Sequence, residues 1–158
     1  MGVRTVLSAT EFGDDDGAPD PRLVEALTVY REDPQGGYLP ALAALSASRV
    51  VVPVVAQGEE STGVDMATVM MRRADGATAL LSFSCLDHLT DWDAQARPLP
   101  TPVARAALAA MQEGCAALLV DHAGPVQLAV AGEDLEHLAR GHRLVALDGG
   151  GWGWLQGS

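Results

Sequence analysis

The feature that most constrains the fold is a continuous apolar run, Val50 to Val55, which is followed by two further strand-like runs. Its β-branched residues predict a buried strand rather than a helix. Pro53 lies inside this run and has no amide hydrogen to donate to a ladder. We therefore expect the strand either to lie at a sheet edge or to be bulged at that residue.

Hairpin signals follow this strand. The dipeptide Asp75-Gly76 supplies the positive φ of a tight turn, and Gly124-Pro125 is a second turn signal. The predicted fold class is α+β, with a mixed, largely antiparallel sheet that is built from hairpins and covered by short helices. The expected strands are residues 50–55, 67–73, 77–83, 116–121 and 126–131, with a further strand at 143–147.

A short helix is predicted directly after the strand that ends at Phe83. Ser84 is expected to cap it, and Asp87 suits its positive end. Leu86, Leu89 and Trp92 are expected to form its buried face.

The other helices are predicted from capping residues, prolines and apolar spacing. Asp20 is expected to cap the first helix, and Thr101 to cap the helix that begins at Pro102 after an extended connector, residues 97–100. The segment Asp33 to Gly37 is expected to separate the first two helices. The expected helices are residues 21–30, 39–47, 102–113 and 133–140.

The domain organisation predicted for the 158 residues is one compact domain with two tails. Residues 1–19 are acidic and predicted to be flexible, residues 20–148 form the domain, and residues 149–158 form a tail rich in glycine and tryptophan. That last segment is ambiguous, because glycines favour mobility whereas tryptophans seldom remain in water.

Charge and cysteine content exclude several classes of function. The ten basic residues are all arginines, against 21 acids, and the net charge is -11, so we expect neither nucleic acid nor an anionic membrane as partner. A lysine Schiff base and a phosphate-loop lysine are excluded. Cys85 and Cys115 are too few for a disulfide framework, and no leader is recognisable at the N-terminus. We therefore expect a cytoplasmic protein without cofactor or metal.

The order of these elements resembles the SseB N-terminal domain family, which is named after an enhanced-serine-sensitivity phenotype. The resemblance covers about residues 22–140. It implies no catalytic residues, because none is assigned to the family. The phenotype suggests an amino acid as a ligand. The segments that carry it are Arg49 to Val55, Leu81-Ser82-Phe83-Ser84, Trp92, and Leu118-Leu119-Val120-Asp121 before Gly124-Pro125.

Several side chains are candidates for chemistry, each beside a plainer structural explanation. Cys85 lies in the first turn of the predicted helix, where a thiol can become reactive, and His88 is within reach of it. Asp121 stands at a strand end, where either a functional group or a β-turn residue is found. Metal-like groupings occur at Asp87, His88, Asp91 and Asp93, and at Glu133 with His137, but neither has the remaining ligands of a known motif.

Two functions are open, with a third behind them. The first is a non-enzymatic interaction or regulatory module, whose acidic surface suits a basic protein partner or whose apolar residues join a second copy of the chain. Trp92, Trp152 and Trp154 are its expected anchors. The second is a binding protein for a small ligand such as an amino acid, held at the free amides around Ser84, Cys85 and Asp87. A cysteine-dependent enzyme is the third.

Overall fold

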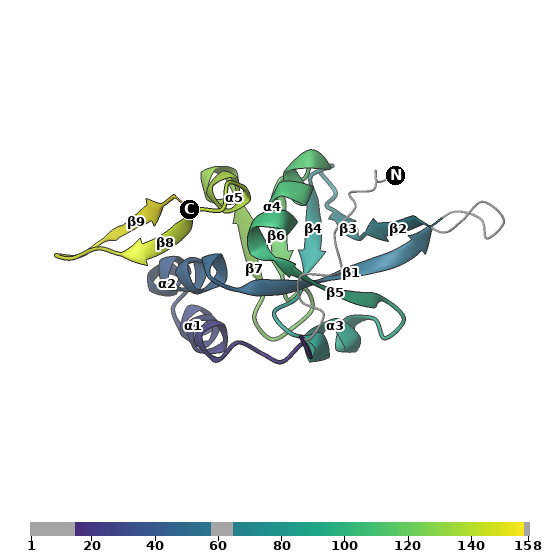
Figure 1. The fold of residues 1–158 in the computed structure, drawn as a ribbon, viewed down its shortest axis with the longest axis horizontal. Coiled ribbons are helices and arrows are strands. Elements are labelled where there is room, and N and C mark those ends of the chain that lie inside the picture. Colours follow the sequence, from purple (N-terminus) through teal and green to yellow (C-terminus); the bar gives the residue numbers. More distant parts are fainter. Residues whose placement is uncertain (1–14, 58–64, 157–158) are drawn as a thin grey trace.

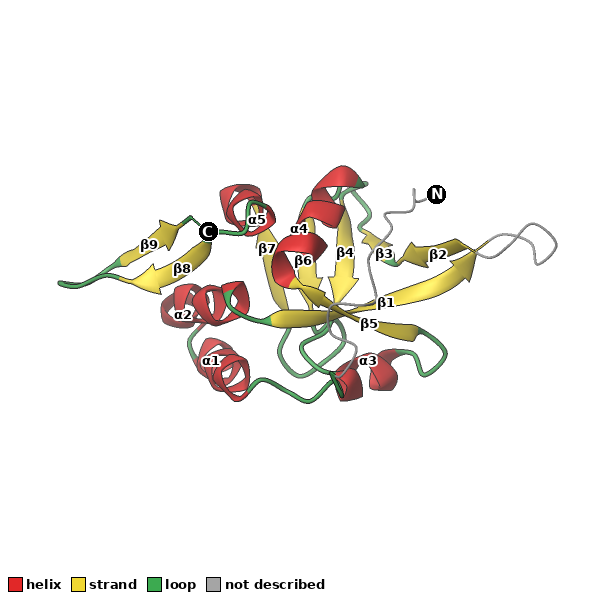
Figure 2. Cartoon of the chain, viewed as in Figure 1, coloured by secondary structure: helices red, strands yellow, loops and turns green. Residues whose placement is uncertain are grey.

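The computed structural model describes residues 15–57 and 65–156 and has an α+β fold (Figure 1). Within these residues the strands form three sheets, with the orders β2-β1-β5, β3-β4-β6-β7 and β8-β9 (Figure 2). The strands are β1 (Arg49–Gln57), β2 (Asp65–Thr68), β3 (Met70–Arg72), β4 (Thr78–Ser82), β5 (Arg97–Pro102), β6 (Ala117–Val120), β7 (Leu128–Ala131), β8 (Arg143–Ala146) and β9 (Trp152–Leu155). The helices are α1 (Pro21–Glu32), α2 (Pro34–Ser46), α3 (Leu86–Trp92), α4 (Val103–Gln112) and α5 (Gly132–Ala139).

Strand β1 is central in its sheet, and its register with β5 is continuous through Pro53, so the prediction of an edge strand or a bulge at that residue is wrong. The predicted connector 97–100 is part of β5, which pairs antiparallel with β1 over its whole length. Prolines 98, 100 and 102 are tolerated because they alternate along this edge strand, at positions whose amides point away from β1. Val51 opposite Pro100 confirms this geometry, since it exchanges both backbone hydrogen bonds with Phe83 on its other side, at 2.7 and 2.8 Å.

The predicted strand 67–73 is divided between two sheets. Strand β2 pairs with β1, whereas β3 pairs with β4 across the Asp75-Gly76 turn, as predicted. The division falls at Val69, whose carbonyl accepts from the Leu81 amide at 2.9 Å. The physical reason is competition between partners, because β1 and β4 each offer a free edge to this segment.

The four-stranded sheet has one parallel pair and two antiparallel pairs. Strand β4 runs parallel to β6, and β6 forms the predicted hairpin with β7. Parallel strands end at the same edge of a sheet, so the residues that follow β4 and β6 lie beside each other. This pairing positions the candidate site described below.

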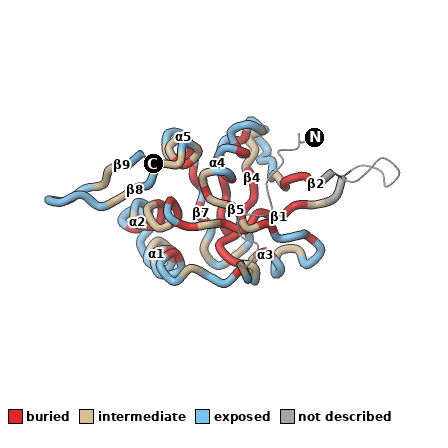
Figure 3. Tube along the Cα trace, viewed as in Figure 1, coloured by how far each residue is buried: buried red, intermediate tan, exposed pale blue. Residues whose placement is uncertain are grey.

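Helices α4 and α5 cover one face of the four-stranded sheet (Figure 2). The side chains on that face are large, and they form the main core together with inward residues of α1, α2 and β1. Figure 3 shows in red where the chain is buried. One row across this face consists of Met70, Leu80, Leu118 and Val130.

Two predictions at helix N-termini are wrong, one about a helix start and one about a cap. Helix α2 begins at Pro34 rather than at residue 39, because the Asp33 side chain accepts from the Gly36 amide and Pro34 fits the first turn. Thr101 does not cap α4, because it lies within β5 and its hydroxyl donates to the Leu99 carbonyl at 2.8 Å. Asp20 caps α1 as predicted, by accepting from the Arg22 amide.

The predicted acidic tail, residues 1–19, lies largely outside the described residues. Its described part contacts the domain through Arg49, which donates to the Asp15 carboxylate at 2.6 Å and to the Ala18 carbonyl at 2.6 Å. A further bond, from Arg49 to the Ser84 carbonyl at 2.9 Å, connects this segment to the end of β4.

The glycine- and tryptophan-rich segment forms a strand. Strand β9 pairs antiparallel with β8, so the predicted domain boundary at residue 148 falls inside a hairpin. The hairpin projects from one end of the molecule (Figure 1). Leu144 of β8 belongs to the main core, and half-buried Trp152 and Trp154 of β9 pack against that core.

Candidate functional site

Asp121 is the buried centre of a polar cluster at the shared end of β4 and β6. Its side chain accepts from the Ser84 amide and from the Ser84 hydroxyl, both at 2.7 Å. The residue is 1% exposed and adopts φ 62°, a left-handed conformation that aspartate tolerates better than most residues. Its own amide continues the parallel ladder by donating to the Ser82 carbonyl.

His88 of α3 completes this cluster. Its Nδ1 lies 3.2 Å from the Asp121 carboxylate and 3.4 Å from the Ser84 hydroxyl. The prediction that Ser84 caps α3 is therefore wrong, because the hydroxyl is bound to Asp121 and the helix begins one residue later with Cys85 as N-cap. Folding overrides the local preference for a cap by placing a buried carboxylate beside that serine.

The amides around the start of α3 are partly occupied. The Leu86 amide donates to the Gly17 carbonyl at 2.8 Å, and the Ser84 amide is bound to Asp121. Cys85 is buried at 3% exposure, while Asp87 is exposed to solvent. The amides of Ser84 and Leu86 are therefore not free to bind a carboxylate ligand at that end of α3.

Trp92, at the other end of α3, packs on Phe83 with ring centroids 5.6 Å apart. A small hollow of about 130 Å³ lies between this end of α3 and the turn after β6, lined by His88, Trp92 and His122 among others. Among the described residues, no group of three or more histidine, cysteine or acidic side chains is arranged to hold a metal ion.

A histidine pair anchors the C-terminal hairpin. Nδ1 of His137 on α5 lies 2.8 Å from Nδ1 of His142, and the indole of Trp154 stacks on His137 at 4.6 Å and 9°. Trp152 and Trp154 are thus in a different part of the domain from Ser84, His88 and Asp121, because the hairpin lies apart from α3 (Figure 1). The predicted site residues do not converge on one place.

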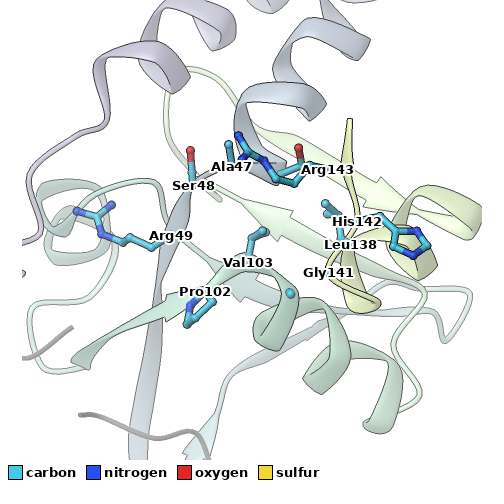
Figure 4. A pocket seen from close by; sticks show the side chains of 11 residues that line it. Ala47, Ser48, Arg49, Pro102, Val103, Leu138, Gly141, His142 and Arg143 are labelled. Atoms are coloured by element: carbon cyan, nitrogen blue, oxygen red, sulfur yellow. The ribbon is translucent and has the colours of Figure 1, made fainter. Parts of the chain in front are cut away.

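A cavity of about 370 Å³ opens between the end of α2, the start of α4 and the turn before β8 (Figure 4). Three basic side chains line it: Arg49, His142 and Arg143. Arg49 is bound to Asp15 and to the Ser84 carbonyl, and His142 is bound to His137. Two of the three basic side chains that a ligand would use therefore already have partners within the chain.

The second face of the four-stranded sheet is open. Met71, Ala79, Ala117 and Ala131 stand in register across all four strands, and Ala129 stands in the next row. We call these five residues the open sheet face. They are half-buried or exposed, and a groove of about 430 Å³ lies over them.

The rim of this groove is basic. It includes Arg72 and Arg73 at the β3 end, and His122 and Gln127 at the β7 end, where the two side chains are 3.1 Å apart. No acidic residue is among the described residues that line the groove. In a chain with 21 acids and ten arginines, this local charge is opposite to the net charge.

The sequence contains a signal for the open sheet face, although strand prediction alone does not use it. Large and small residues alternate in Leu128-Ala129-Val130-Ala131, and Ala79 and Ala117 each precede a pair of leucines in β4 and β6. Such alternation distinguishes a packed face from a thinly covered one. The partners of Arg49 have no comparable local signal, because Asp15 is distant in sequence.

The fold and these surfaces define the protein as a small α+β domain with a covered and an open sheet face. The chain belongs to the SseB family, because the family model for the SseB protein N-terminal domain matches residues 23–137. The comparison with curated proteins gives no match, and neither does the comparison with solved structures. In the described part of the chain, no helix is both long and apolar enough to cross a membrane.

Proposed function

We propose that this domain is a non-enzymatic interaction module that binds a segment of another protein on the open sheet face. The observation that carries the proposal is the row of Met71, Ala79, Ala117 and Ala131, which is apolar, continuous over four strands and accessible. Sheets of this kind are normally covered on both sides or polar on the exposed side. An accessible apolar row over a groove is typical of a docking site.

The polar cluster supports a structural rather than a catalytic role. The Asp121 carboxylate is bound by two groups of Ser84 and lies next to His88, and Ser84 itself is 2% exposed. A hydroxyl that is buried and donates to a carboxylate is not available for attack on a substrate. Burial raises the pKa of the Cys115 thiol, which keeps that cysteine protonated and unreactive.

The cellular setting that we propose is the cytoplasm. Cys85 and Cys115 are both buried and unpaired, and buried thiols are compatible with a reducing compartment.

The first test is a pair of charge-neutral substitutions in the groove. Ala117→Gln with Ala129→Gln places two long polar side chains on the apolar floor, and we expect partner capture to fall by about tenfold or more. The measurement is affinity capture from cells that express the protein, quantified by mass spectrometry. Ala47→Gln with Ala94→Gln is the matched control, because these alanines are exposed elsewhere.

Both double variants must first show the circular dichroism and unfolding midpoint of the unmodified chain. A partner that is retained equally on the groove variant and the control variant would show that docking takes place on another surface. Such a result would remove the open sheet face from consideration.

A further inference from the structure

We infer that the occupant of the open sheet face is an acidic amphipathic helix of the partner protein. This inference rests on the proposed function and specifies the chemistry of the partner. Three observations carry it: the missing helical layer, the small side chains of the floor, and the basic rim.

The first observation is the asymmetry of the two sheet faces. Helices α4 and α5 cover the face that carries Leu80, Leu118 and Val130, whereas the face with Ala79, Ala117 and Ala131 lacks a helix among the described elements. A layer of helix on each side is the usual way in which such a sheet buries its apolar surface. A helix from a partner would supply the second layer.

The second observation concerns the shape of the floor. Alanines at 79, 117 and 129 leave room above the strands, in the groove of about 430 Å³. A helix packs about 10 Å from a sheet, so a floor of methyl groups is complementary to large side chains such as leucine on the incoming helix. Leu119 borders the groove and is only 8% exposed, and further along β4 the same face is already covered, since Leu81 is 1% exposed. The groove that could receive a helix is therefore limited to one end of the sheet.

The third observation is the charge of the rim. Arg72 and Arg73 border the groove on one side and His122 on the other, with no acid among the described lining residues. Arg73 also contacts Asp75 at 2.8 Å, but both side chains are more than half exposed, so this pair competes weakly with an incoming carboxylate. A basic partner suits the net charge of the whole chain, whereas the groove itself is complementary to acids.

A test uses three peptides, each about 18 residues long, with one leucine stripe and with Glu, Lys or Gln on the remaining helical surface. Binding of each labelled peptide to the full chain is measured by fluorescence anisotropy at low and at physiological salt. We expect the Glu peptide to bind about tenfold more tightly than the Lys peptide, with a preference that decreases as salt rises. The net charge of -11 favours the opposite order, so this result would reflect the groove.

Variants separate this inference from the proposed function. Arg72→Glu with Arg73→Glu should reverse the preference while the Gln peptide binds unchanged. Ala117→Gln with Ala129→Gln should weaken all three peptides, and Ala47→Gln with Ala94→Gln should weaken none.

Equal or tighter binding of the Lys peptide, still sensitive to Ala117 and Ala129, would overturn the acidic helix and leave the docking face standing. Insensitivity of every peptide to those two alanines would overturn both. Sedimentation velocity of the chain alone provides a further check. A dimer that the groove substitutions dissociate would identify a second copy as the occupant and would also overturn the acidic helix.

Discussion

Asp121 shows how one side chain can hold two segments together. Its carboxylate is the buried acceptor for two donors of Ser84 and lies 3.2 Å from His88 Nδ1, so it joins the end of β6 to the start of α3. We expect Asp121→Ala to lower the free energy of unfolding by about 3 kcal/mol, because it leaves buried donors without an acceptor and places alanine at a positive φ. Urea denaturation measures this difference.

Asp121→Asn and His88→Ala are the controls for that prediction. Asparagine retains an acceptor and tolerates the left-handed conformation, so its cost should be smaller. The His88 side chain is about one-third exposed, and its removal should cost less than about 1 kcal/mol. A loss for His88→Ala as large as that for Asp121→Ala would mean that the histidine is the principal partner.

At the scale of elements, the β8–β9 hairpin depends on contacts with the domain. A two-stranded sheet alone is marginally stable in water, and here Trp154 stacks on His137 of α5. We expect Trp154→Ala to reduce amide protection in residues 143–155 by about tenfold, which corresponds to roughly 1.4 kcal/mol of local opening. Protection in β4 and β6 should not change. Hydrogen exchange followed by mass spectrometry resolves the two regions.

Leu155→Ala is the control for the hairpin, because Leu155 lies on the same strand and is 56% exposed. It should leave exchange in the hairpin nearly unchanged. Equal loss of protection in both variants would indicate that strand propensity, rather than the stacked indole, stabilises this hairpin.

At the scale of the whole molecule, Arg49 connects the segment before α1, strand β1 and the end of β4. Hydrogen bonding to the Arg49 guanidinium holds the pKa of Asp15 below its ordinary value of 3.8. A lowered pKa in the folded state adds stability that is complete above the unfolded pKa and is lost as pH falls through the folded one. Asp15→Asn should therefore reduce stability by about 1–2 kcal/mol at neutral pH and by progressively less below about pH 4.

Unfolding by urea at several pH values, for the unmodified chain and for Asp15→Asn, measures this dependence. Asp16→Asn is the matched neighbour, since Asp16 is exposed and accepts only from the nearby Ala18 amide among its described bonds. A difference between the unmodified chain and Asp15→Asn that is independent of pH would show that the charge of Asp15 is not what Arg49 recognises.

The sequence alone determined the fold class, the two hairpins, the cap of α1 and the family, because each depends on local pattern. Asp75-Gly76 favours a tight turn through the conformational preferences of these two residues alone. Successive side chains of a strand point to opposite faces of a sheet, so the pattern of large and small residues separates the two faces. The predictions that Ser84 and Thr101 cap helices were wrong, because the hydrogen-bond partner of each residue depends on segments that are distant in sequence. Ser84 has the chemistry of a helix cap, yet it bonds to the distant Asp121. Thr101 is drawn into β5 by pairing with the distant strand β1, and there its hydroxyl donates to the nearby Leu99 carbonyl.

Only the tertiary structure decided which residues meet. The parallel pairing of β4 and β6 places Ser84 beside Asp121, which is 37 residues away, and Arg49 binds Asp15 across 34 residues. It also decided that the part of one sheet face that carries Ala79, Ala117 and Ala131 stays uncovered, while the face with Leu80, Leu118 and Val130 is packed under α4 and α5. Long-range pairings of this kind depend on how the whole chain buries its apolar surface, and no local pattern encodes that choice.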